Sequence, residues 1–310
     1  MSDVDDLLQK TSRTFALTIP YLPPPTREEV SLAYLLFRII DTFEDATRWS
    51  PDRRVSRIRD FLPLLEAPDP AQARRFSEKS LVDPPVDHAG YLELLREIPF
   101  VLSSLHALPE QSRRILIEHV KRSADGMMSV VSRAGTDRVV RINTIDELRD
   151  YCYIVAGIVG EMLTELFLLG RPRLASVADD LRARGRWFGE GLQLVNILKD
   201  VDVDAAEGRV YIPPAQHDDV MALARQDLRA ATEYTLALQE RGSEVGLVTF
   251  NALLVRLATG TLAAIRDKRP GNKLTRPQVF AVIAEVLSQV DRGDPALPAA
   301  TADAQLPAAE

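Results

Sequence analysis

Apolar residues return at intervals of three and four along almost the whole chain, and this helical period constrains the fold more than any other feature. It runs from residue 28 to about residue 292, with almost no alternation of period two, so few strands are expected. The predicted fold class is therefore all-α. Helices are predicted near residues 28–47, 52–66, 90–106, 110–134, 145–170, 173–206, 217–241, 244–268 and 276–292, separated by proline-rich connections such as 68–85.

Composition favours one domain. The chain has 310 residues and 46% of them are hydrophobic, enough to bury one large core, and no Gly/Ser linker or abrupt change of charge divides it. We expect a single helical domain over residues 1–293. Residues 294–310 are rich in alanine and proline with few large apolar side chains, which predicts a flexible tail.

Charge and cysteine content exclude several classes. The 38 Lys and Arg residues against 45 Asp and Glu residues give a net charge of −7, which argues against a nucleic-acid-binding protein with a general basic surface. The single cysteine, Cys152, excludes an intramolecular disulfide and a multi-cysteine metal site. The acidic start of the sequence lacks the order of a signal peptide, so a cytoplasmic location is expected.

Two stretches, 151–170 and 245–265, are as apolar as a membrane span of about 20 residues. Glu161 and Glu165 interrupt the first and Arg256 the second, which favours buried helices. Such helices either form ordinary core or line an apolar cavity, and hydropathy leaves both readings open.

A first acidic cluster ends the helix predicted at 28–47. Asp41, Glu44 and Asp45 stand at positions i, i+3 and i+4 and so share one helix face after a strongly apolar run. A solvated acidic helix end is the alternative.

A second polar stripe runs along the helix predicted at 173–206. Gln193, Asn196, Asp200 and Asp204 follow at steps of three, four and four, although a core helix avoids polar groups that lack partners. Two such faces on different helices either repel each other or jointly hold Mg²⁺, which takes oxygen ligands and bridges substrate phosphates. Zinc is disfavoured, because the four histidines are scattered along the chain.

If the ligand is a diphosphate, cationic side chains must complete the site. Arg38, Lys199 and Arg209 lie within five residues of these acids in sequence. The alternative for each is a surface salt bridge, which contributes little energy.

These motifs resemble the squalene/phytoene synthase family of head-to-head prenyltransferases over about residues 11–286. The resemblance rests on DTFED at 41–45, on the stripe 196–204 followed by GRVYIP at 208–213, and on YCYIVAGIVG at 151–160. It implies an isoprenoid-synthase-type helical fold around a central apolar cavity, in which Mg²⁺ bridges both acidic motifs and the prenyl diphosphates.

The resemblance also implies roles for particular residues. Tyr151 would lie near the reacting carbons, where its hydroxyl handles protons and its ring stabilises a carbocation, whereas a buried packing tyrosine is the alternative. Asp41, Asp45, Asp200 and Asp204 would act together with it. The implied metal ligands are Asp41, Glu44, Asp45, Asn196, Asp200 and Asp204. The implied substrate-binding residues are Ser12, Arg13, Phe15, Tyr34, Arg38, Gln193, Asn196 and Arg209.

Segment 250–276 looks more like squalene synthases than phytoene synthases, and the chain resembles their soluble bacterial form. The implied reaction condenses two farnesyl diphosphates to presqualene diphosphate and reduces it to squalene with NADPH. Squalene synthases place basic residues of this segment against the NADPH phosphates, so the resemblance makes Lys273 and Arg276, with Lys199, candidates for binding NADPH. The sequence lacks a Rossmann glycine fingerprint, so NADPH would bind through a non-Rossmann surface.

Several alternatives stay open. The enzyme could stop at presqualene diphosphate, capture it with water as a hydroxysqualene synthase does, or make phytoene from longer substrates. From another class, the chain could be a non-catalytic helical assembly factor. A monomer is favoured, with transient contact at the inner membrane face for release of an apolar product.

Overall fold

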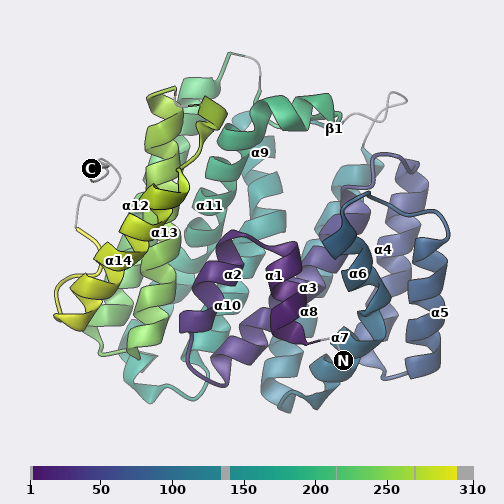
Figure 1. Ribbon diagram of the computed structural model, residues 1–310, viewed down its shortest axis with the longest axis horizontal. Helices are drawn as coiled ribbons and strands as arrows, with labels where there is room; N and C mark the ends of the chain where they lie inside the picture. The colour runs from purple at the N-terminus through teal and green to yellow at the C-terminus, as the bar shows by residue number, and fades with distance from the viewer. Residues whose placement is uncertain (1–2, 134–139, 214, 269, 299–310) are drawn as a thin grey trace. The chain divides into compact units, whose positions relative to one another are not determined.

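The computed structural model describes residues 3–133, 140–213, 215–268 and 270–298. This part of the chain is almost entirely helical, which confirms the predicted all-α class (Figure 1). Strands β1 (Val140–Arg141) and β2 (Arg209–Val210) pair in a two-stranded ladder, next to which Ile142 N donates to Val210 O at 2.9 Å.

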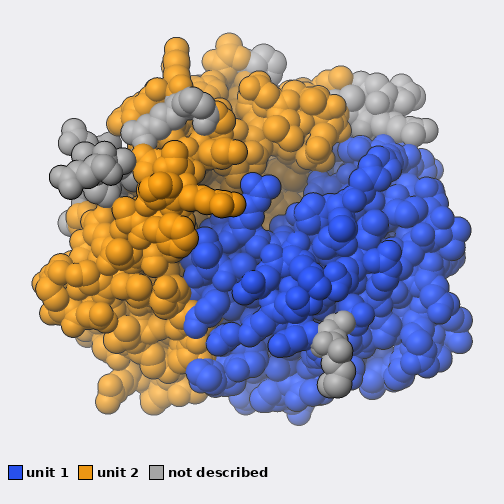
Figure 2. Space-filling view, viewed as in Figure 1, with its two compact units in different colours: residues 1–20, 24–140 blue, residues 21–23, 141–310 orange. Residues whose placement is uncertain are grey.

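The chain divides into two compact units, coloured in Figure 2. Unit 1 holds Met1–Pro20 and Pro24–Val140, and unit 2 holds Tyr21–Pro23 and Arg141–Glu310. The sequence carries no linker at this division and predicted one domain.

Unit 1 is built around α3, whose side chains supply the centre of its core. Leu35, Leu36, Ile39 and Ile40 on this helix are each 0% exposed, because their spacing places them on one face. Helix α3 contacts α1, α4, α6, α7 and α8. The helices of the unit are α1 (Val4–Thr11), α2 (Thr14–Thr18), α3 (Thr26–Glu44), α4 (Pro51–Glu66), α5 (Pro70–Leu81), α6 (Ala89–Arg96), α7 (Ile98–Ala107) and α8 (Glu110–Ser132), with the 3₁₀ turn η1 (Ile19–Tyr21) following α2.

The sequence-based boundaries are wrong at three places in unit 1. Helices α1 and α2 were not predicted, and α5 lies where a proline-rich connection was expected. Pro70 occupies the first turn of α5 and Asp69 caps it, accepting from Gln72 N at 2.9 Å, so this proline starts a helix. The helix predicted at 90–106 is two helices that meet at Glu97, because Pro99 begins the second.

Unit 2 is organised by the long helix α11, which contacts α10, α12 and α13. Its contact with η2 is backbone to backbone, since a Cβ on Gly189 would lie 1.9 Å from Ala156 O. This contact fixes the helix that carries Tyr151 against the helix that carries the second acidic stripe. The elements are α9 (Ile145–Cys152), the π turn η2 (Tyr153–Gly157), α10 (Ile158–Leu168), η3 (Pro172–Val177), α11 (Ala178–Ala206), α12 (His217–Glu240), α13 (Val245–Arg266), η4 (Pro270–Asn272) and α14 (Arg276–Asp291).

Two helical stretches of unit 2, Ile145–Leu168 and Val245–Arg266, are long and apolar enough to cross a membrane. In the second, 83% of the most apolar window is buried within the protein, against 56% in the first. Buried Arg256 in α13 pairs with Glu285 of α14 at 2.6 Å. The expected burial is therefore strongest for α13, which behaves as a core helix.

The start of the predicted tail is anchored. Gln239 Nε2 donates to Asp294 O at 2.7 Å, and Ala296 N donates to Gln239 Oε1 at 2.8 Å. Ala296 and Leu297 are fully buried. The chain is thus held on α12 beyond the predicted end at residue 293, and 299–310 lie outside the described residues.

Candidate active site

The first acidic face lies at the end of α3 in unit 1. Asp41 and Asp45 are both partly exposed, and Arg38 Nη1 lies 3.5 Å from Asp41 Oδ2. Burial raises the pKa of Asp41 to about 6, with Arg38 opposing the shift and Asp45 adding to it. Asp41 is therefore a carboxylate that further positive charge would stabilise.

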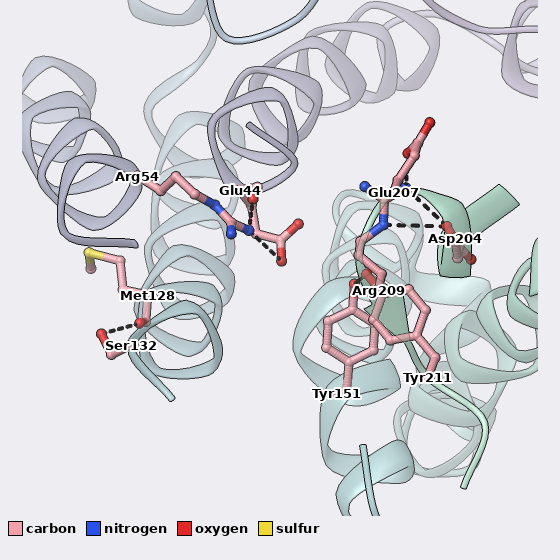
Figure 3. Close-up of polar contacts among 9 residues, drawn as sticks. All are labelled: Glu44, Arg54, Met128, Ser132, Tyr151, Asp204, Glu207, Arg209 and Tyr211. Carbon is pink, nitrogen blue, oxygen red and sulfur yellow. Dashed lines mark hydrogen bonds and ion pairs between the residues drawn. The ribbon is translucent and has the colours of Figure 1, made fainter. Parts of the chain in front are cut away.

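Glu44 is buried, unlike Asp41 and Asp45. It is 4% exposed, and Arg54 of α4, 1% exposed, donates to its backbone carbonyl and lies 3.8 Å from its carboxylate (Figure 3). At about 100° per residue, position 44 lies about 60° to one side of position 41 and position 45 about 40° to the other, so Glu44 is at the edge of this face that meets α4. The structure gives Glu44 an internal ion pair, and its role as a metal ligand stays a prediction.

The N-terminal segment lies beside this face within unit 1. Ser12 Oγ accepts from Phe15 N at 3.0 Å at the start of α2, and the rings of Phe15 and Tyr34 are 5.4 Å apart. Arg38 Nε donates to the Tyr34 hydroxyl at 3.3 Å, and Arg13 is exposed at the start of α2. The structure thus links two predicted substrate-binding residues, Phe15 and Tyr34, to Arg38.

The second acidic face lies on α11 in unit 2. Asn196 is exposed, Asp200 and Asp204 are half-buried, and Gln193 is half-buried one turn earlier. Lys199 Nζ lies 3.0 Å from Asp200 Oδ2 and donates to Asn196 Oδ1 at 3.2 Å. Lys199 is therefore part of this acidic face.

Arg209 in β2 turns back onto the end of α11. Its Nη2 lies 3.0 Å from Asp204 Oδ1, and it also pairs with Glu207 (Figure 3). Gly208, with φ of 80°, makes the turn that a side chain would strain. The short spacing in sequence places Arg209 beside Asp204, and its contact with diphosphate stays a prediction.

Tyr151 stacks on a second tyrosine, Tyr211 (Figure 3). The Tyr151 hydroxyl donates to the Tyr211 hydroxyl at 2.9 Å, the ring centroids are 4.7 Å apart, and both side chains are buried. Tyr211 was not among the candidate residues, and the only signal for it was its place in the GRVYIP run. The two hydroxyls form a chain along which a proton can pass.

A cavity of about 300 Å³ adjoins this region of unit 2. Asp204, Arg209 and Tyr211 line it together with mainly apolar residues: Ile197, Val201, Ala205, Val210, Ile212, Pro213, Ala215 and His217. An apolar space bordered by one charged pair and one phenol fits a ligand that is apolar with a polar end.

The basic NADPH candidates lie elsewhere in unit 2. Lys273 and Arg276 are exposed, on either side of the N-terminal cap of α14, where Thr275 Oγ1 accepts from Gln278 N at 3.4 Å. The preceding turn, η4, contacts α11 and α13.

The oxygen donors fit Mg²⁺ as it is usually bound in proteins. Within the described ranges, no group of three or more His, Cys, Asp or Glu side chains is gathered as a metal cage. Mg²⁺ needs no such cage, because it usually takes one or two carboxylates and completes its shell with water and substrate phosphates. Asp41 with Asp45 in unit 1, and Asp200 with Asp204 in unit 2, offer donors of this kind, and the raised pKa of Asp41 marks a carboxylate that a divalent cation would stabilise.

Comparison with known proteins identifies the family. The profile of the family described as "Squalene/phytoene synthase" matches residues 8–217, more than half of the chain. The chain belongs to the squalene/phytoene synthase family. The resemblance read from the acidic motifs is thereby confirmed.

The similar curated proteins include squalene synthases, in agreement with this family. The chain is 28% identical over 289 residues to a squalene synthase of Eremothecium gossypii, covering 89% of this chain and 59% of the relative. It is 31% identical over 207 residues to a squalene synthase of Schizosaccharomyces pombe, covering 67% of this chain and 43% of the relative. The chain thus spans about half the length of these curated relatives.

Solved structures share the fold. A structure of TcSQS with the ligand E5700 superposes with a TM-score of 0.72 at 22% identity, covering 94% of this chain and 88% of that one. A dehydrosqualene synthase with a ligand gives a TM-score of 0.57 at 20% identity, covering 93% and 95%. These likenesses show the helical architecture.

Proposed function

We propose that the protein is a Mg²⁺-dependent head-to-head prenyltransferase that condenses two farnesyl diphosphates to presqualene diphosphate and reduces it with NADPH to squalene. The observation that carries this proposal is in unit 2, where the α11 acidic stripe meets Arg209 and the Tyr151–Tyr211 pair beside an apolar cavity. Membership of the family and the squalene synthases among the relatives support the choice of substrate.

Each acidic face would bind diphosphate through Mg²⁺ with the oxygens of its own unit. Asp41 and Asp45 supply carboxylates from unit 1, and Asn196, Asp200 and Asp204 supply oxygens from unit 2. When bound there, Mg²⁺ would neutralise diphosphate charge and make that group a better leaving group.

The chain's own cations would bind diphosphate oxygens at the acidic face beside which each of them lies. Arg38 and Arg209 carry planar guanidinium groups that match diphosphate oxygens, and each already lies beside an acid of its own unit. Lys199 adds a point charge between Asn196 and Asp200. These donors orient the departing diphosphate and stabilise the charge that develops on it.

The tyrosine pair would act at the hydrocarbon end. The Tyr151 ring would stabilise positive charge on the prenyl carbons, and its hydroxyl, which donates to that of Tyr211 at 2.9 Å, would relay the proton lost in the condensation to the departed diphosphate. The apolar residues that line the cavity would limit the access of water, which would otherwise capture the cation.

The reductive step would use the basic residues before and within α14. Lys273 and Arg276 are exposed and able to bind the phosphates of NADPH.

The protein would act as a cytoplasmic monomer that contacts the inner membrane face transiently to release its apolar product.

Product analysis tests the proposal. Purified protein is incubated with farnesyl or geranylgeranyl diphosphate and Mg²⁺, with and without NADPH, and products are identified by mass spectrometry. We expect presqualene diphosphate without NADPH and squalene with it. A product that stays at presqualene diphosphate at saturating NADPH, or that is hydroxysqualene or phytoene, would assign the corresponding rival activity. If neither substrate is converted, a catalytic role is refuted.

A matched pair of variants ties the activity to α11. Asp200→Asn should abolish turnover while the helical circular-dichroism spectrum is kept. Asp202→Asn, an exposed carboxylate two residues away on another side of the helix, should retain turnover. Equal activity in the two variants would contradict the assignment of the acidic stripe.

A further inference from the structure

Tyr91 of α6 lies against the arginine of the first acidic face, and neither the sequence motifs nor the family match give it a role. The Arg38 guanidinium carbon is 5.2 Å from the centroid of the Tyr91 ring and 5.6 Å from that of Tyr34. Both distances are within the range of cation–π attraction. Two aromatic rings from different helices therefore contact one cationic side chain.

Helix α6 is held by α1 at the residue next to Tyr91. A Cβ on Gly90 would lie 2.3 Å from Lys10 O, so the two backbones touch and only glycine fits. Lys10 Nζ also reaches across to Glu93 Oε1 at 2.8 Å. The His88 side chain caps the helix, and the centroid of its ring lies 4.2 Å from that of Tyr91, with the two rings tilted by 36°. These contacts fix the position of the Tyr91 ring.

The second ring is anchored on the same helix α1. The Tyr34 hydroxyl donates to Thr11 O at 2.6 Å and accepts from Arg38 Nε at 3.3 Å. Arg38 then reaches Asp41 Oδ2 at 3.5 Å. Helices α1, α3 and α6 of unit 1 thus together restrict a side chain that would otherwise sample many rotamers.

We propose that Tyr91 is a positioning residue for diphosphate binding, whose ring holds the Arg38 guanidinium at the first acidic face. This inference rests on the proposed function, because it takes the anion at this face to be the diphosphate of a prenyl substrate. An arginine ordered before the ligand arrives loses less conformational freedom on binding, so the ring contributes to affinity without touching the substrate. Removing the ring should weaken binding in proportion to the cation–π contact that is lost.

Two substitutions separate the ring from the hydroxyl. Tyr91→Leu removes the ring, and we expect it to raise both the KM for farnesyl diphosphate and the inhibition constant of inorganic diphosphate by about 3- to 30-fold. Tyr91→Phe keeps the ring and should leave both within about 2-fold of wild type. Thermal melting shows whether each variant folds, and Tyr91→Met provides a second ring-less side chain if Tyr91→Leu does not. Equal effects of the Phe and ring-less variants would overturn the proposal.

A double-mutant cycle tests whether Tyr91 acts through Arg38. Arg38→Met should itself weaken diphosphate binding, and Tyr91→Leu added to it should weaken binding no further. A full additional loss in the double variant would overturn the proposal, because a purely structural residue adds its effect in either background. Arg53→Met is the matched control. It removes another cation–π contact of unit 1, in which the Arg53 guanidinium carbon lies 4.1 Å from the centroid of the Trp49 ring, and it should leave the KM for farnesyl diphosphate unchanged.

The outcomes also distinguish this inference from the proposed function. If Arg38→Met weakens binding and Tyr91→Leu does not, the positioning role is wrong and the substrate assignment stands. If Arg38→Met has no effect on the KM or on diphosphate inhibition, the role of this face in diphosphate binding is wrong, and the inference fails with it.

Discussion

Asp227 of α12 carries a buried carboxylate whose ionisation should set part of the pH dependence of stability. It is 2% exposed, and its Oδ1 lies 3.9 Å from Arg149 Nη2 of α9, which lies equally far from Oε2 of buried Glu190 on α11. Arg186 on α11 also pairs with Glu190. Burial raises the pKa of Asp227 to about 7, with Arg149 and Arg186 opposing the shift and Glu190 adding to it.

The size and sign of the effect follow from that shift. The ordinary pKa is 3.8, so the rise to about 7 corresponds to roughly 4 kcal/mol at about 1.4 kcal/mol per unit. Because the native state binds the proton more tightly than the unfolded chain, it holds more protons between pH 4 and 7. The contribution of Asp227 to stability is therefore greatest below about pH 4 and is lost as the pH rises to about 7.

Asp227→Asn removes this titration and keeps the shape of the side chain. Urea unfolding measures the free energy of unfolding of the variant and of wild type at each pH. The value for the variant minus that for wild type should be about 2–3 kcal/mol larger at pH 8 than at pH 5. If the stability difference between Asp227→Asn and wild type is the same at both pH values, or smaller at pH 8, Arg149 stabilises an ionised Asp227 and the reasoning from burial is refuted.

Three further predictions concern packing and chemistry. Gly189→Ala should lower the free energy of unfolding, measured in urea, by about 3 kcal/mol or more, because the new Cβ would lie 1.9 Å from a backbone oxygen. Gly242→Ala is the control: this glycine has a left-handed φ of 66° but open space around it, so the substitution should cost only about 1 kcal/mol. Tyr151→Phe should lower kcat much more than it raises the KM for farnesyl diphosphate, and Tyr211→Phe should do the same; a pure KM effect would assign the pair to binding. Lys273→Ala should weaken NADPH binding by about 10- to 150-fold and let presqualene diphosphate accumulate at limiting NADPH, with squalene recovered as NADPH is raised; unchanged NADPH dependence would remove Lys273 from the cofactor site.

Several features of the protein could be predicted from the sequence because they depend on neighbours within one or two helical turns. The periodicity of apolar residues identified the all-α class, since helix geometry repeats every 3.6 residues whatever the helix packs against. The same geometry predicted that Gln193, Asn196, Asp200 and Asp204 form a stripe on α11. Arg209 lies beside Asp204 because only a short turn separates the two residues in sequence. The family could be recognised from these local motifs as well.

Other features depended on packing between distant segments. Glu44 shares the helical spacing of Asp41 and Asp45, yet the position of α4 decides that it pairs with Arg54. Tyr211 meets Tyr151 across 60 residues of sequence, and Tyr91 meets Arg38 only because Gly90 lets α6 touch α1. No local period encodes such contacts, because they are set by how helices pack rather than by the geometry within one helix. Helical spacing was enough to predict which helices carry the acidic groups, whereas the aromatic and basic side chains beside them depend on how helices distant in sequence pack together.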